Sequence, residues 1–153
     1  MVEGGRAGNL NRMAVNEIFI DAPPARVFAV LADAESYSDW VYGAQDVRSS
    51  DTEWPEEGAA LEHASGLPGL TLVDETVVLE SEPPTRLVLE AKIGPFGTFR
   101  IELELKPEGT GTHVTMTEHP IGGMARLGGP LTEAGLLGRN VLSLRKLREL
   151  SAG

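Results

Sequence analysis

The sequence predicts an α+β fold in which a curved antiparallel sheet is wrapped around one long C-terminal helix. Apolar and polar residues alternate with a period of two through much of residues 43–119, as in strands that bury one face. Gly- and Pro-rich breaks divide this region into about six strands. One amphipathic helical pattern, roughly Leu131–Leu150, follows and is the only element long enough to cover the apolar face.

Before this region, the chain predicts a first strand and two short helices. Residues 14–20 are a β-rich run that stops at Pro23-Pro24, and proline suits the first turn of a helix because its missing N–H has no partner to lose there. Residues 25–32 place apolar side chains at helical spacing. Asp33 can cap a second short helix that extends to Trp40, so we expect the two helices to form a V.

The alternation assigns the residues of the later strands to two faces. We expect Arg86 and Arg100 on the outer, solvated face, with His113 exposed. Pro120 is expected to end the last strand, which places His119 in a turn, and the Gly-rich residues 121–130 then lead into the long helix. The positions predicted to face inward are Leu87, Leu89, Ala91, Ile93, Phe99, Ile101, Leu103, Leu105, Val114, Met116 and, at its strand's end, Glu118.

The long helix is expected to bury one stripe of its surface. Asn140 falls near the centre of the stripe and should point at the sheet or into a cavity, whereas Arg139 falls at the margin, toward solvent. The apolar members of the stripe are Leu136, Leu137, Val141, Leu144, Leu147 and Leu150.

Length and composition indicate one globular domain, residues 13–153, preceded by a flexible leader over residues 1–12. The chain has 153 residues, of which 41% are hydrophobic and 24% charged, enough for one sizeable core. The formal net charge of −10 repels phosphate backbones, so we expect no nucleic-acid partner. No apolar run is long enough to span a membrane and no signal peptide is evident, so we expect a cytoplasmic protein without membrane insertion, as a monomer or homodimer.

Several kinds of chemistry lack support in the sequence. There is no Cys, which excludes disulfides, thiolate catalysis and Cys-based zinc sites. Glu62-His63 and Glu118-His119 offer metal donors, but neighbours on a strand point to opposite faces, so no metal site is expected. The glycines of residues 122–129 match no phosphate loop or dinucleotide motif, and we expect no cofactor.

Three stretches carry a family resemblance: the opening Ile18–Leu31 (IFIDAPPARVFAVL), Tyr37–Trp40 (YSDW) and the close Gly138–Leu147 (GRNVLSLRKL). In these stretches and in its order of elements, the chain resembles the START-like, or SRPBCC, superfamily, and is most similar to the polyketide cyclase/dehydrase-type branch. The resemblance covers nearly the whole chain beyond the leader. It implies a helix-grip fold with a deep cavity between the long helix and the sheet. Relatives include lipid and hormone carriers, aromatase/cyclases and co-chaperone-like domains, so the fold alone does not decide the function.

Three polar residues are candidates for contact with a ligand. Asn140 either forms a structural hydrogen bond to a strand or to bound water, or orients a ligand carbonyl or hydroxyl. Glu118 is a candidate acid or base if it lies in an apolar pocket, where its pKa would rise, and is merely solvated if the strand end is wet. His63 is in phase with Leu61, and its imidazole could exchange a proton with a substrate or serve as a buried structural group.

The predicted function is binding of a small apolar molecule, such as a lipid, polyketide or other aromatic, in an internal cavity. The alternative is a polyketide cyclase or dehydratase, with Glu118 and His63 as catalytic candidates; the absence of an evident cavity Arg weakens it. A second alternative is a protein-interaction module without a small ligand. Besides the three polar residues, the ligand-binding candidates are Trp40, Met116, Leu103, Leu89, Leu137, Val141 and Leu144.

Overall fold

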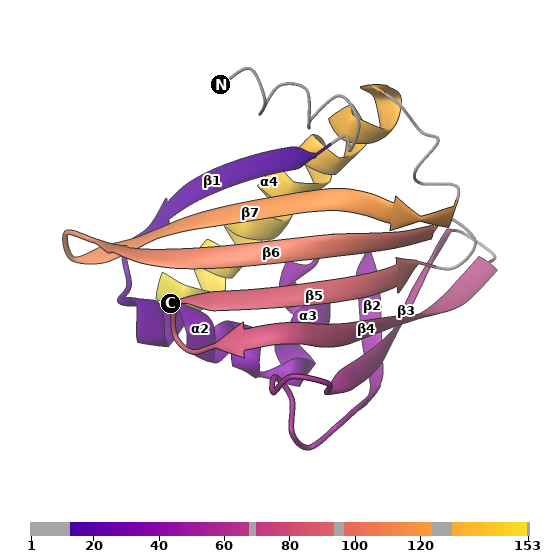
Figure 1. Ribbon diagram of the computed structural model, residues 1–153, viewed down its shortest axis with the longest axis horizontal. Coiled ribbons are helices and arrows are strands. Elements are labelled where there is room, and N and C mark those ends of the chain that lie inside the picture. The colour runs from indigo at the N-terminus through magenta and orange to yellow at the C-terminus, as the bar shows by residue number, and fades with distance from the viewer. Residues whose placement is uncertain (1–12, 68–69, 94–96, 124–129, 153) are drawn as a thin grey trace.

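The computed structural model of the chain describes residues 13–67, 70–93, 97–123 and 130–152 (Figure 1). The predicted leader and most of the Gly-rich connection lie outside these residues. None of the helices in the described segments is long and apolar enough to cross a membrane. In chain order the elements are β1 (Ala14–Ile20), α2 (Pro24–Ala32), a 3-10 turn η1 (Ala34–Ser36), α3 (Tyr37–Trp40), β2 (Ala44–Ser50), β3 (Ala60–Leu67), β4 (Leu70–Glu82), β5 (Arg86–Ile93), β6 (Gly97–Glu108), β7 (Gly111–Gly122) and α4 (Pro130–Ala152).

The strands form one seven-stranded antiparallel sheet in the order β1-β7-β6-β5-β4-β3-β2. Strands β2 to β7 are the predicted six-stranded meander, and β1 adds to β7 at the opposite edge. Helix α4 crosses behind β1, β7 and β6 in Figure 1, with α2 and α3 against it on the same side of the sheet. The predicted α+β helix-grip fold is therefore confirmed.

The hydrophobic core lies between the sheet and its helices, in one large and one small cluster of the described residues. The inward positions of β5, β6 and β7 predicted from the alternation are buried wherever the structure describes their side chains, as are Leu144 and Leu147 of α4 and Phe28 and Leu31 of α2. Burying a large aliphatic or aromatic side chain contributes about 1.5–3 kcal/mol, so this row of side chains holds α4 onto the sheet.

The outer face of the sheet carries a lattice of ion pairs, as expected for Arg86 and Arg100. The Arg86 guanidinium lies 3.2 Å from Glu80 and 3.5 Å from Glu102, and Arg100 lies 3.7 Å and 3.0 Å from the same two residues. Val88 is directly opposite Glu80 on one neighbouring strand and Glu102 on the other, and it is fully buried although its phase is outward.

The prediction that Pro120 ends the last strand is wrong. Strand β7 continues to Gly122, so His119 is a strand residue and not part of a turn. Pro120 pairs with Phe99 next to a register shift between Thr98 and Phe99. An irregularity of this kind tolerates proline because the missing N–H interrupts a ladder that is already broken there.

Two glycines give a matched pair of predictions about stability. A Cβ at Gly111 would overlap the carbonyl oxygen of Ile20 and the ring of Phe19, so we expect Gly111→Ala to lower the free energy of unfolding by about 2 kcal/mol or more. Gly138 lies within α4 and a Cβ there would meet nothing within 4 Å, so Gly138→Ala should raise it by about 0.5–1 kcal/mol. Urea denaturation of both variants checks the pair, and equal effects would contradict it.

Candidate functional site

Most of the buried polar side chains that the structure describes on the inner side of the sheet fall into two groups. The sheet-side group lies on α3, β3 and β4 and consists of Tyr37, His63, Asp74 and Thr76. The helix-side group lies on β7 and α4 and consists of the buried Glu118 and Asn140 together with the half-buried Arg139.

Strand pairing and contacts of the Tyr37 side chain hold the sheet-side group together. His63 and Asp74 are directly opposite each other in the β3–β4 register, and Thr76 lies two residues along the same face. The Tyr37 hydroxyl and the Thr76 Oγ1 are 3.0 Å apart, and the Tyr37 ring lies over His63 with 4.9 Å between centroids. Burial raises the pKa of Tyr37 to about 12, so this phenol is uncharged at neutral pH.

His63 is a buried and neutral imidazole. Its side chain is 4% exposed, and burial lowers its pKa below the usual 6.5, while the carboxylate of Asp74 opposes that shift. The Nδ1 atom is buried and has no hydrogen-bond partner in the part of the chain that the structure describes. His63 therefore presents an unsatisfied ring nitrogen to the interior.

In the helix-side group, Glu118 and Arg139 form an ion pair. The Arg139 Nη2 atom donates to both Glu118 carboxylate oxygens, at 2.9 and 2.7 Å, and the Glu118 side chain is completely buried. The expectation that Arg139 points to solvent is wrong because its long side chain reaches from the margin of the helix to the end of β7. Glu118 is therefore buried and not solvated, and its carboxylate is paired with a cation. The Arg139 Nε atom is buried and has no partner among the described residues.

Asn140 is fully buried on the inner face of α4, as the helical wheel predicts. It lies one turn from Leu136 and one turn from Leu144, which are both buried. Among the described residues, neither its Oδ1 nor its Nδ2 atom has a hydrogen-bond partner. An unsatisfied buried polar group costs about 1–3 kcal/mol, so this amide would gain free energy from a molecule that hydrogen-bonds to it.

The two groups face the same interior across a strip of apolar side chains. Leu89 and Ile101 occupy the cross-strand row between Val78 on β4 and Glu118 on β7. Burial raises the pKa of Tyr37 and lowers that of His63, and the charge of Arg139 opposes the first shift and adds to the second. The interior therefore combines an apolar wall with polar groups on either side of it, among them the Glu118–Arg139 ion pair.

The apolar candidates divide into buried and exposed positions. Trp40, Met116, Leu103, Leu89 and Leu144 are buried, and Leu137 is partly buried. The expectation that Val141 and Leu150 share the buried stripe is wrong, because their side chains are 37% and 41% exposed. The buried stripe of α4 is narrower than predicted and includes two serines, Ser143 and Ser151, which bond to neighbouring backbone.

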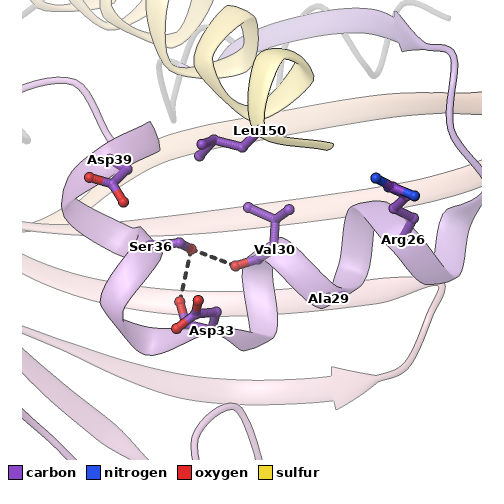
Figure 2. A pocket seen from close by; sticks show the side chains of 7 residues that line it. All are labelled: Arg26, Ala29, Val30, Asp33, Ser36, Asp39 and Leu150. Carbon is purple, nitrogen blue, oxygen red and sulfur yellow. Dashed lines mark hydrogen bonds between the residues drawn. The ribbon is translucent and has the colours of Figure 1, made fainter. Parts of the chain in front are cut away.

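Two grooves on the outer surface contain fewer unpartnered buried polar atoms than the interior, as far as the structure describes them. Figure 2 shows a groove of about 370 Å³ between α2, the following turn and the end of α4. Within it the Ser36 hydroxyl donates to the carbonyls of Val30 and Asp33, and Arg26 Nε donates to the carbonyl of Ser151 at 2.8 Å. The second groove, about 220 Å³, lies between β1 and α4, where Asn16 Nδ2 donates to the carbonyl of Leu137.

Sequence reasoning missed four residues of the interior: Tyr37, Asp74, Thr76 and Arg139. Asp74 and Thr76 are in phase with Val78, an alternation that could have placed them on the inner face. No signal in the sequence pairs Arg139 with Glu118, since they are 21 residues apart and on different elements.

The lowered pKa of His63 predicts a pH dependence of stability. The unfolded chain protonates this residue near pH 6.5, whereas the folded protein does so only at lower pH, so stability should fall as pH falls below about 6.5. One such histidine contributes a slope of at most about 1.4 kcal/mol per pH unit. His119, whose pKa is also lowered mainly by burial, acts in the same direction.

Replacing His63 with Phe should therefore flatten the stability profile between about pH 6.5 and pH 5. Urea denaturation midpoints of the wild type and the variant across this range measure the difference. Parallel profiles would show that His63 titrates normally in the folded protein.

The fold and its interior define a class of protein. A long C-terminal helix held by a curved antiparallel sheet, with two short helices between the first two strands, is the helix-grip arrangement. The family model described as polyketide cyclase / dehydrase and lipid transport matches residues 14–152, and the chain belongs to this family. No curated protein matches the chain.

Solved structures share the fold at low sequence identity. A Chromobacterium violaceum protein is 16% identical with a TM-score of 0.72, over 92% of this chain and 98% of its own. An uncharacterized Rhizobium leguminosarum protein is 19% identical with a TM-score of 0.73, over 92% and 94%. The di-domain ARO/CYC protein BexL, from the BE-7585A biosynthetic pathway, is 16% identical with a TM-score of 0.72, over 99% of this chain and 53% of BexL.

Proposed function

We propose that the protein binds a small, mostly apolar molecule between α4 and the inner face of the sheet. The observation that carries the proposal is Asn140, whose amide is completely buried on the inward face of α4 and has no hydrogen-bond partner among the described residues. Leu at this position would make the folded protein more stable, because an unsatisfied buried amide costs free energy. A bound molecule that supplies the missing hydrogen bonds explains why the amide is there.

The surroundings of Asn140 support the same proposal. Aliphatic side chains of β5 and β6 form an apolar wall, and the unpartnered His63 Nδ1 faces the interior from β3. Ligand sites are typically apolar with a few polar groups that fix orientation. The family to which the chain belongs is described by both cyclase/dehydrase activity and lipid transport, and each requires the uptake of an apolar molecule.

Native mass spectrometry of the purified protein tests this proposal, followed by extraction and identification of whatever is bound. We expect a discrete additional mass of a few hundred daltons, or a shift after incubation with apolar candidates. A clean apo mass under both conditions would contradict the proposal and favour a protein-interaction module.

A second candidate function, catalysis on a ketone-containing substrate, is favoured by the sheet-side group. A buried neutral His63 opposite Asp74 and beneath Tyr37 has the composition of a proton-transfer site. The fold shared with BexL, an ARO/CYC protein, is consistent with it. In this reading His63 removes a proton from the carbon next to a carbonyl, and Glu118 is the second catalytic candidate.

Solvent deuterium uptake at the methyl group of 2-acetylnaphthalene, followed by NMR, tests the catalytic candidate directly. Catalysis requires protein-dependent exchange that His63→Phe abolishes while binding of the ketone persists. Glu118→Gln tests the carboxylate in the same way. Exchange at the rate of the buffer alone would leave binding as the function.

A further inference from the structure

We infer that the ligand is uncharged and carries a hydroxyl or carbonyl oxygen, and that the interior rejects carboxylate and ammonium groups. The inference rests on the proposed binding function and deepens it by naming the chemical class of the ligand.

The polar groups that remain unpartnered in the interior suit neutral hydrogen bonding. Asn140 offers one amide oxygen and one amide nitrogen, both buried and unpartnered. Asn140 Nδ2 can donate to a carbonyl or hydroxyl oxygen, and Oδ1 can accept from a hydroxyl. The Nδ1 atom of His63 and the Nε–H group of Arg139 add two further unpartnered positions.

The charged groups of the interior are engaged with protein. The Arg139 guanidinium is bonded to both oxygens of Glu118, so its charge is already matched by a carboxylate. Asp74, the other carboxylate in the described interior, also takes part in an interaction. These three groups together carry one net negative charge. A ligand carboxylate would be repelled by this negative charge and would find no unpaired cation among the three groups. The free energy that it loses by leaving water would therefore not be offset.

A cationic group is disfavoured by the same burial. His63 is held neutral chiefly by its removal from water, although Asp74 lies directly opposite it. An environment that disfavours an imidazolium beside a carboxylate also disfavours a ligand ammonium group.

A matched series of naphthalene probes separates these possibilities: naphthalene, 2-naphthol, 2-acetylnaphthalene, 2-naphthoate and 2-naphthylmethylammonium. Their common ring holds apolar burial nearly constant, so differences in Kd report the polar group. We expect 2-naphthol and 2-acetylnaphthalene to bind about tenfold more tightly than naphthalene, as one or two neutral hydrogen bonds allow. The two ions should bind at least about tenfold more weakly than 2-naphthol. Isothermal titration calorimetry near pH 7 measures all five.

The variant Asn140→Leu assigns the preference to a residue. It should keep its affinity for naphthalene and lose most of the preference for 2-naphthol. The control is Leu142→Gln, a substitution at a position that is 38% exposed on the same helix, and it should bind the series as the wild type does.

The outcomes distinguish this inference from the proposal beneath it. Tight binding of naphthoate or naphthylmethylammonium would overturn the inference and leave the binding function standing. Equal binding of naphthalene and 2-naphthol, or a preference that survives in Asn140→Leu, would also overturn it. Failure of every probe to bind would count against both the function and the inference.

Discussion

Replacing Asn140 with Leu is expected to raise the free energy of unfolding of the ligand-free protein by about 1–2 kcal/mol. The substitution removes a buried amide that has no partner, a group that costs about 1–3 kcal/mol, and retains a side chain of similar size. Leu also has a higher helix propensity than Asn, by a few tenths of a kcal/mol. Urea denaturation of protein stripped of bound molecules gives the measurement.

Thr112 provides the control for this substitution. Its side chain is completely buried, and its hydroxyl donates to the carbonyl of Ala22 at 2.7 Å. Thr112→Val should therefore lower stability by about 1 kcal/mol, the opposite sign. If Asn140→Leu also destabilises, then the Asn140 amide is satisfied in the free protein and its role is structural.

The same Asn140→Leu substitution should have the reverse effect when ligand is present. A molecule that binds only the folded state stabilises it in proportion to its affinity, so the wild type gains more than a variant that has lost hydrogen bonds to the ligand. A residue that lowers stability alone and raises it with ligand is one retained for binding.

Replacing Arg139 with Met should destabilise the protein by about 3–5 kcal/mol, a larger loss than that predicted for any other substitution described above. Met approximates the aliphatic stem of Arg139 but leaves the Glu118 carboxylate fully buried without its partner. An uncompensated charge in a low-dielectric interior is costly because its hydration is lost and nothing replaces it. Chemical denaturation at neutral pH measures the effect.

Two further variants isolate the cause of this loss. Arg145→Met, on an exposed position of the same helix, should change stability by no more than about 0.5 kcal/mol. The double variant Glu118→Leu with Arg139→Met should recover most of the loss, since both charges are then absent. A loss of under about 1 kcal/mol in Arg139→Met would show that water reaches Glu118 in solution.

Strand alternation predicts which face of the sheet Glu118 lies on, but it does not predict its partner. Its phase with Val114 and Met116 places it on the inner face, and the structure buries it there. What the carboxylate does there depends on Arg139, which sits on another element. Phase is a local property of one strand, whereas a partner is chosen by how α4 docks on the sheet.

Local sequence patterns are enough to predict the fold class, the order of elements, the meander and the inward faces of β5, β6 and β7. These follow from the period of two in strands, the spacing of 3.6 in helices and the chemistry of turns, all of which act between residues close in the chain. The central place of Asn140 on the buried stripe of α4 follows in the same way.

The pairing of polar side chains in the interior depends on how the elements pack together. This packing brought Arg139 to Glu118, opposed His63 to Asp74 and set Tyr37 against Thr76, and it left Val141 at the surface. These outcomes depend on the docking angle of α4, on the curvature of the sheet and on the reach of long side chains. Such quantities are set by packing between elements far apart in the chain, and a periodic pattern carries no record of them.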